Sequence, residues 1–310
     1  MVTKRSLSGT KTMKSELERF QLQHLSVLND YLESYLSNLN GERTLKDAML
    51  YSVSAGGKRI RPMLILAICC ESRRKIDKDV YAVAASLELL HTYSLIHDDL
   101  PEMDNDDLRR GQLTNHKKFG QAIAVLAGDG LLTTAFECIG KTNLDDSIKA
   151  TLMSALAKAA GPQGMVSGQV ADIQGENKQL TLAQLQELHQ CKTGALIDYS
   201  CYAGGVLSAL SAAQQAELHQ FAMSFGLAFQ IYDDILDVVS TEKQMGKAVH
   251  KDQSEHKNTY PELMGLDGAY RQLDAAILKA QASLDILEKM GMKTELLSGF
   301  LDYFARRKIK

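Results

Sequence analysis

Several features that divide or cross-link a chain are scarce in this sequence. Its 310 residues include only 4 prolines and no long polar tract, so there is no obvious linker and we expect one domain. The 5 cysteines are odd in number and form no C-x-x-C pair, which argues against a disulfide framework and a zinc site. Free thiols in a reducing, cytoplasmic compartment are the expected state.

The sequence also has no large excess of positive or negative charge. The 35 Lys and Arg residues nearly balance 38 Asp and Glu residues, which argues against nucleic acid as the main partner. No window approaches the roughly 18 uninterrupted apolar residues of a membrane span, so we expect no stable membrane insertion. Residues 1–15 carry four bases and no acid but no apolar targeting stretch, and we expect a disordered start before a domain over 16–310.

Apolar residues recur at helical spacing through most of the chain. No segment shows sustained alternation with a period of two, and the central segments are too apolar for surface helices, so we expect an all-α bundle. The predicted helices cover residues 16–39, 45–53, 63–70, 80–96, 117–136, 147–160, 181–188, 194–210, 212–239, 270–289 and 292–305.

The stretch from Leu87 to Gly111 runs from apolar helix into a dense acidic cluster that ends at Arg109 and Arg110. Its carboxylates are Asp98, Asp99, Glu102, Asp104, Asp106 and Asp107. Packed this closely, they repel one another unless cations neutralise them. Carboxylate oxygens suit Mg²⁺, and arginine forks fit phosphate oxygens. The pattern favours a metal-diphosphate site, with a solvated acidic loop as the alternative.

A straight helix would not bring the outer aspartates of this cluster together. At about 100° per residue, Asp98 and Asp104 lie about 120° from a common face. Pro101 removes a backbone donor and disfavours helical geometry at Leu100, so a bend there could place Asp104 beside Asp98. If the helix stayed straight, Glu102, four residues after Asp98, would be the rival ligand.

A second acidic cluster, Asp233, Asp234 and Asp237, ends another apolar helix. Asp233 and Asp237 share a helix face, and buried unpaired charge is costly, so the cluster needs a metal or a basic partner. Two facing clusters could hold Mg²⁺ ions between them and clamp one diphosphate.

Basic residues that could hold the rest of an anion occur at four places. In the loop over 54–62, two glycines precede three bases and a proline at a helix start, a backbone suited to approach an anion. The others are Lys192, Lys247 and Lys257. Taken alone, each of these three lysines is better explained as a solvated surface base, and the loop is equally consistent with a surface turn.

Six motifs together resemble the trans-isoprenyl diphosphate synthases. They are GGKRIRP at 56–62, HDDLPEMDNDDLRRG at 97–111, LAGDGLL at 126–132, KTGAL at 192–196, FQIYDDILD at 229–237 and GK...D...KNTYP from 246 to 261. The two extra residues in the first aspartate motif are similar to those of the bacterial farnesyl diphosphate synthases.

The resemblance implies a polyprenyl synthetase domain over 16–310 that folds as an isoprenoid-synthase-type bundle around a deep cavity, in a cytoplasmic homodimer. It implies condensation of isopentenyl diphosphate with dimethylallyl or geranyl diphosphate to farnesyl diphosphate, by ionisation, condensation and proton elimination. It also implies roughly three Mg²⁺ ions per site, with Mn²⁺ able to substitute.

The resemblance also assigns residues to roles. The metal ligands would be Asp98, Asp104 and Asp233, supported by Asp99 and Asp237. The allylic diphosphate would be held by Arg109, Lys192 and Lys247, with Thr193 and Gln230 at the reacting end. Isopentenyl diphosphate would be held by Lys58, Arg61, His91 and Arg110, with Lys257 near a mobile closure. Product length would be limited by Tyr93 and Ser94.

Other functions stay open at this point. Geranylgeranyl or geranyl diphosphate could be the product. A terpene cyclase would need a second metal motif with an Asn or Asp, a Ser or Thr three residues later and a Glu four residues beyond that. Counted from Asp234, those positions hold Asp237 and Thr241, and Glu242 is one place out of register. A non-catalytic partner subunit would be expected to have lost aspartates that are intact here.

Overall fold

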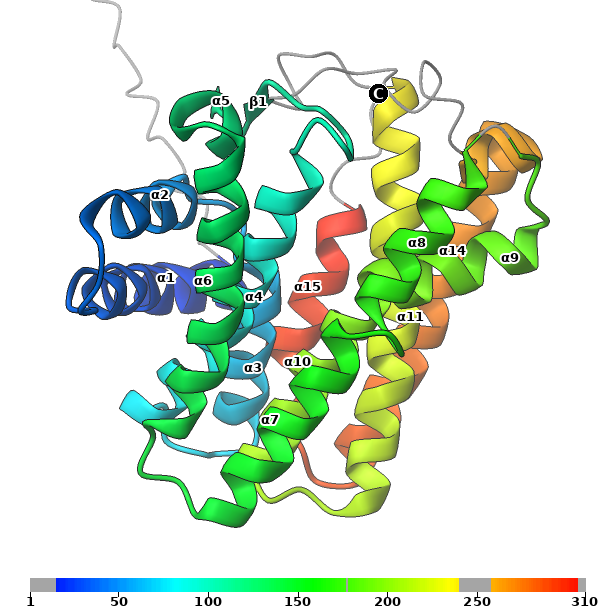
Figure 1. The fold of residues 1–310 in the computed structure, drawn as a ribbon. Coiled ribbons are helices and arrows are strands. Elements are labelled where there is room, and N and C mark those ends of the chain that lie inside the picture. Colours follow the sequence, from blue (N-terminus) through cyan, green and yellow to red (C-terminus); the bar gives the residue numbers. More distant parts are fainter. Residues whose placement is uncertain (1–14, 177, 240–257, 306–310) are drawn as a thin grey trace, which may run out of the picture.

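The computed structural model describes residues 15–176, 178–239 and 258–305, and it is helical almost throughout (Figure 1). The N-terminal half contains α1 Glu16–Ser37, α2 Arg43–Ser54, α3 Ile60–Glu71, α4 Lys78–Asp98, α5 Asn115–Phe119, α6 Gln121–Gly140 and α7 Asp146–Ala160. The rest contains α8 Met165–Gly175, α9 Leu182–His189, the π-helix η1 Gln190–Gly194, α10 Ala195–Leu207, α11 Ala212–Val239, α14 Tyr260–Lys289 and α15 Glu295–Ala305. The predicted all-α class is confirmed.

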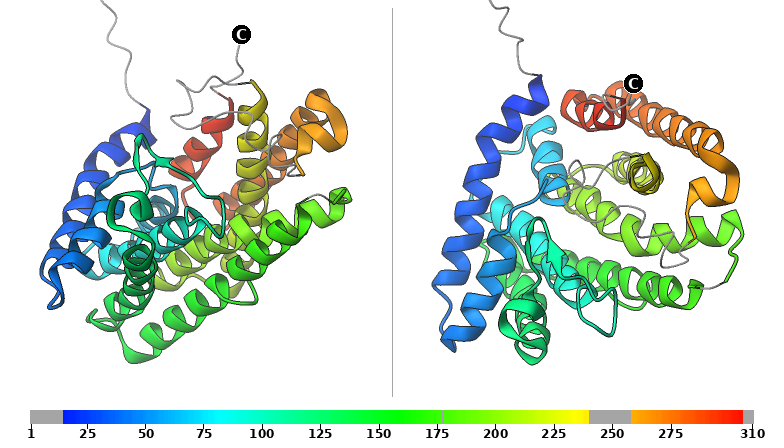
Figure 2. Two further views of the ribbon diagram at one scale, coloured as in Figure 1. Left: turned by 45° about the horizontal axis from the view of Figure 1, so that its top comes forward. Right: turned by 90° about the horizontal axis from the view of Figure 1, so that it is seen from above.

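The helices stand around a common centre, with α11 seen nearly end-on among the others from above (Figure 2, right). One hydrophobic core runs from Phe20 in α1 to Phe304 in α15. Helices α3 and α4 are buried on nearly every side, which is why their sequences are apolar without a polar face. The first aspartate motif therefore begins on a helix, α4, that the core holds firmly.

A buried ion pair ties the glycine-rich loop to α4. Arg59 Nη1 lies 2.5 Å from Glu88 Oε1, and each side chain is only 2% exposed. Arg59 also donates to Val53 O at 2.5 Å and to Asn29 Oδ1 at 3.2 Å. Removing one partner of such a pair costs about 3 to 5 kcal/mol, so Arg59 fixes the loop rather than serving as a mobile base.

The structure corrects several predicted elements. The helix expected over 117–136 is split into α5 and α6 by Gly120, whose φ is +87°. The last long helix begins at Tyr260, with non-helical geometry at Gly265, rather than at residue 270. Two features were missed: α8, and the antiparallel pair of β1 Leu108–Arg109 and β2 Gln112–Leu113, whose strands are too short to show alternation.

The expectation about the start of the chain changes as well. Ser15, placed in the disordered start, is the ordered N-cap of α1 and forms a reciprocal capping box with Glu18; residues 1–14 lie outside the described residues. Within the described part of the chain, α6 is long and apolar enough to cross a membrane by length and composition, although Asp129 and Glu137 interrupt its apolar run. Only 44% of its apolar window is buried.

Candidate active site

A cavity of about 940 Å³ lies between α4, α8, α10, α11 and the loop before α3, and both aspartate clusters face it. Its lining includes most of the predicted site: Lys58, Arg61, His91, Ser94, Asp98, Asp104, Arg109, Arg110, Lys192, Thr193, Gln230, Asp233 and Asp237. Asp99 and Tyr93 are not part of the lining. Lys247 and Lys257 lie outside the described residues, so their roles stay predictions.

The predicted bend in the first motif is confirmed. Helix α4 ends at Asp98, and the chain folds back so that Asp104 N donates to Asp98 O at 2.8 Å. Asn105 takes a left-handed conformation with φ +48° and donates from its backbone to Leu100 O. Asp104 lines the cavity, whereas Glu102 does not, because the helix stops before Pro101.

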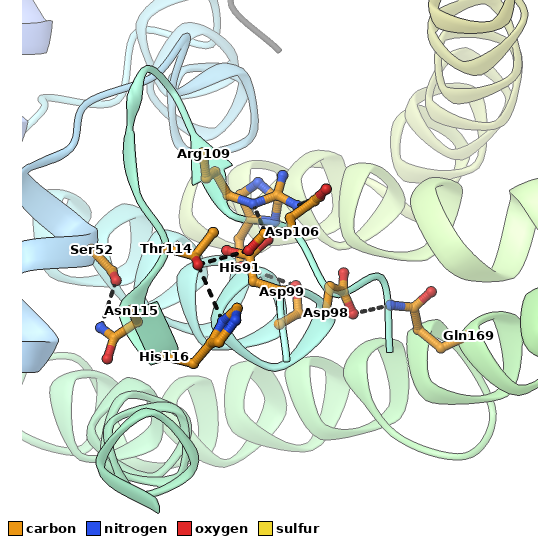
Figure 3. A network of polar contacts seen from close by, with 11 residues as sticks. Ser52, His91, Asp98, Asp99, Asp106, Arg109, Thr114, Asn115, His116 and Gln169 are labelled. Atoms are coloured by element: carbon orange, nitrogen blue, oxygen red, sulfur yellow. Dashed lines mark hydrogen bonds and ion pairs between the residues drawn. The ribbon is translucent and has the colours of Figure 1, made fainter. Parts of the chain in front are cut away.

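The carboxylate of Asp98 lies at the end of α4, in a buried position that disfavours its negative charge. Burial raises the pKa of its carboxyl to about 6; the nearby Asp104 also raises this pKa, and the Lys192 charge lowers it. Gln169 of α8 donates its side-chain amide to Asp98 Oδ1 (Figure 3). Because burial destabilises the ionised form of this carboxylate, any cation that binds beside it stabilises that form.

Asp99 and Arg109 form an internal pair. Arg109 Nε donates to Asp99 Oδ1 at 2.5 Å, and its Nη2 reaches Asp106 Oδ2 at 3.3 Å (Figure 3). Asp99 is 3% exposed, and burial raises the pKa of its carboxyl to about 7 while Arg109 opposes the rise. In this arrangement Asp99 holds Arg109 at the cavity wall.

The aspartates of the second cluster differ in their contacts, and Asp234 is the one that joins two helices. Asp234 Oδ2 accepts from Tyr260 N at 3.0 Å and its Oδ1 accepts from Gln230 Nε2 at 3.1 Å, which fixes α11 against α14. Thr193 Oγ1 in turn donates to Gln230 Oε1 at 3.0 Å. The predicted pair Thr193 and Gln230 is therefore held by Asp234.

The other two aspartates of this cluster face the cavity. Asp237 is buried, and its Oδ2 has no hydrogen-bond partner among the described residues. The charge of Asp233 acts on Arg61, where it opposes the lowering of the arginine pKa by burial. Both carboxylates are thus positioned to interact with cations.

A π-helix presents Lys192 and Thr193 to the cavity. It fits tightly between α8 and α11: a Cβ atom on Gly168 would lie 2.2 Å from Lys192 N, and one on Gly226 would lie 3.2 Å from Gly194 Cα. Single π turns are frequent at functional sites. Lys192 Nζ lies 2.5 Å from Asp172 Oδ2 of α8, which orients the ammonium.

The bases assigned to isopentenyl diphosphate gather on another part of the wall. Arg61 Nη1 and His91 Nε2 are 3.2 Å apart, and burial lowers the pKa of both groups, so a neutral His91 accepts from Arg61. Arg110 donates to Gly56 O and lies against Gly57, where a Cβ would be 2.6 Å from the guanidinium carbon. Glycine is favoured at position 57 because its φ of +129° lies in a region that L side chains rarely adopt.

The two residues expected to limit product length lie in different surroundings. Ser94 lines the cavity and donates to His91 O at 2.9 Å. Tyr93 is buried with its ring edge-on to His97, the centroids 5.5 Å apart. A Cβ on Gly128 of α6 would lie 2.1 Å from His97 Nε2, so the ring against which Tyr93 packs is itself held tightly between α4 and α6.

Sequence reasoning missed Gln169 and Asp172. Both line the cavity from α8, a helix whose interior glycine and exposed valines hide its periodicity. Their spacing of three residues places them on one helix face, which was the available signal.

The donor set fits Mg²⁺ bound together with a phosphate ligand. Within the described residues no group of three metal-binding side chains is close enough to hold an ion alone. Mg²⁺ is usually held by one or two carboxylates together with substrate phosphates and waters. The buried Asp237 oxygen and the raised pKa of Asp98 both favour such a cation.

Comparison with known proteins identifies the family of this chain. The polyprenyl synthetase family model matches residues 42–292. The farnesyl diphosphate synthase of Geobacillus stearothermophilus is 50% identical over 276 residues, covering 86% of this chain and 91% of that protein. The chloroplastic geranylgeranyl pyrophosphate synthase of Capsicum annuum is 43% identical over 266 residues, covering 85% and 71%.

Solved structures show the same fold. Geranyltransferase from Helicobacter pylori, complexed with magnesium and isoprenyl diphosphate, matches with a TM-score of 0.81 and 35% identity over 95% of this chain and 98% of that one. Geranyltransferase from Legionella pneumophila matches with a TM-score of 0.81 and 30% identity over 94% and 98%. The resemblance seen in the sequence is confirmed: the chain belongs to the polyprenyl synthetase family and is a prenyltransferase.

Proposed function

We propose that this enzyme is a Mg²⁺-dependent farnesyl diphosphate synthase that condenses isopentenyl diphosphate with dimethylallyl or geranyl diphosphate. The observation that carries the proposal is that one cavity is lined by carboxylates from two helix ends and by two sets of bases. Farnesyl is favoured over geranylgeranyl or geranyl products because bacterial relatives at 42 to 50% identity carry that name.

The residues that line the cavity have different roles in the reaction. Asp98, Asp104 and Asp233 would hold the metal ions, with Asp99 and Asp237 in support. Bound Mg²⁺, with Mn²⁺ as a substitute, supplies positive charge that stabilises the leaving diphosphate. Lys192 and Arg109 hold that diphosphate beside Thr193 and Gln230.

The condensation needs a second substrate and protection from water. Lys58, Arg61, His91 and Arg110 hold isopentenyl diphosphate so that its double bond attacks the allylic cation formed when the C–O bond ionises. The proton lost afterwards goes to the departing diphosphate. Apolar lining from Leu95, Met165, Leu196 and Phe229 keeps water from the cation.

Two other functions have less support. For a terpene cyclase, Thr241 and Glu242 lie outside the described residues, and the register mismatch in the sequence stands. A non-catalytic subunit has no need for the intact aspartates that line this cavity.

We also propose that two copies pair through exposed apolar residues of α6 and α8. These residues are Val125 and Leu126 on α6 and Val166, Val170 and Ile173 on α8. A second copy, rather than lipid, would then cover α6 in a cytoplasmic enzyme. Sedimentation velocity should show two chains per particle, and Leu126→Glu should yield single chains; a single-chain wild type would contradict the pairing.

Removing either metal-binding carboxylate should disable turnover. We expect Asp98→Ala and Asp233→Ala each to lower kcat by about a hundredfold or more, because each removes a ligand where charge develops. Circular dichroism should show unchanged helical content, and exposed Asp146→Ala is the matched control. Full activity of the wild type in excess chelator would contradict the proposal.

Product length tests the position of Ser94. Because Ser94 lines the cavity one turn before Asp98, Ser94→Phe should fill space used by the growing chain and shift the product from fifteen carbons to ten. Chromatography of dephosphorylated products measures this. Ser94→Ala, which changes the same position without adding bulk, is the control. Farnesyl product from Ser94→Phe would show that other residues set the length.

A further inference from the structure

Lys58 differs from its neighbouring bases in what orients it. Arg61 is held by His91, and Arg110 by Gly56 O. A lysine ammonium sits on a flexible four-carbon stem that loses rotamer freedom when it binds. Lys58 therefore needs a separate partner if it is to present a fixed charge to the cavity.

That partner comes from the far end of the chain. Lys58 Nζ donates to the hydroxyl of Tyr303 on α15, 245 residues later in sequence. The ammonium also lies 4.8 Å from the Tyr303 ring centroid and 5.9 Å from that of Phe229, within cation–π range. Two rings and one hydroxyl thus fix the charge.

The packing of α15 holds Tyr303 in place. Its ring is edge-on to Tyr232 and Phe304, with centroids 5.6 Å away in each case. The first turn of α15 is anchored by buried Glu71, which accepts from Leu296 N at 2.5 Å. The phenol therefore comes from a fixed element and not from a loose tail.

We propose that Tyr303 is a positioning residue that aims Lys58 at the diphosphate of isopentenyl diphosphate. This inference rests on the proposed function. An ammonium has three N–H donors; the phenol takes one and leaves two for phosphate oxygens. Helix α15, which contributes no residue to the cavity lining, thereby sets the affinity for one of the two substrates.

Steady-state kinetics with each substrate varied in turn tests this role. Tyr303→Phe keeps the ring and removes the hydroxyl, so we expect KM for isopentenyl diphosphate to rise about tenfold while KM for geranyl diphosphate and kcat change less than twofold. Tyr303→Leu should raise the same KM further, because it also removes the cation–π contact. Tyr270→Phe on α14, outside the cavity lining, is the matched control.

A double-mutant cycle separates positioning from general packing. In a Lys58→Ala background, Tyr303→Phe should have no further effect on KM. An equal rise in both KM values, an undiminished effect in that background, or no effect in wild type would overturn the inference. If wild type made no prenyl product, the proposed function would fail, and calorimetry of isopentenyl diphosphate binding to wild type and Tyr303→Phe would still decide the role of Tyr303.

Discussion

Buried negative charge is the constraint on which this site depends. Carboxylates placed at the ends of apolar helices lose hydration and must be compensated by hydrogen bonds, bases or metal ions. Asp99 is compensated by Arg109, Asp172 by Lys192, and Asp234 by Tyr260 N and Gln230. These internal pairs form a frame around Asp98, whose pKa is raised to about 6.

Close helix approaches make that frame rigid. Gly128 admits the His97 ring, Gly168 admits the backbone of Lys192, and Gly226 admits Gly194. The first contact fixes the end of α4 beside Asp98, and the other two fix the π turn that carries Lys192. A side chain at Gly168 would displace Lys192, which lines the cavity, and side chains at Gly128 or Gly226 would crowd residues that lie next to the cavity wall in sequence, His97 and Gly194.

The sequence predicted those features that local chemistry determines. Helical spacing was enough for the all-α class, and Pro101 was enough for the bend that brings Asp104 to Asp98. It could not predict α8, because the exposed apolar residues of that helix obscure its inward face. The partners of Asp99 and Lys58 could not be predicted from the sequence either. Arg109 meets Asp99 only because the chain turns back after α4, and Tyr303 meets Lys58 from the far end of the chain.

Some assignments depended on the resemblance rather than on spacing. Tyr93 and Ser94 are adjacent on α4, yet only Ser94 lines the cavity, because successive helix residues point in different directions. Arg59 and Arg61 look equivalent in the motif, but only Arg59 is neutralised by a buried ion pair with Glu88. Such neighbouring residues differ in burial and in their contacts, which cannot be read from a single sequence.

We propose that both aspartate clusters act together to hold one metal-bound diphosphate. Calorimetric titration of inorganic diphosphate, with and without Mg²⁺, into wild type, Asp98→Asn and Asp233→Asn tests it most directly. We expect tight binding only with Mg²⁺, weakened about a hundredfold by either substitution. Binding that is unaffected by Mg²⁺, or that survives both substitutions unchanged, would contradict it.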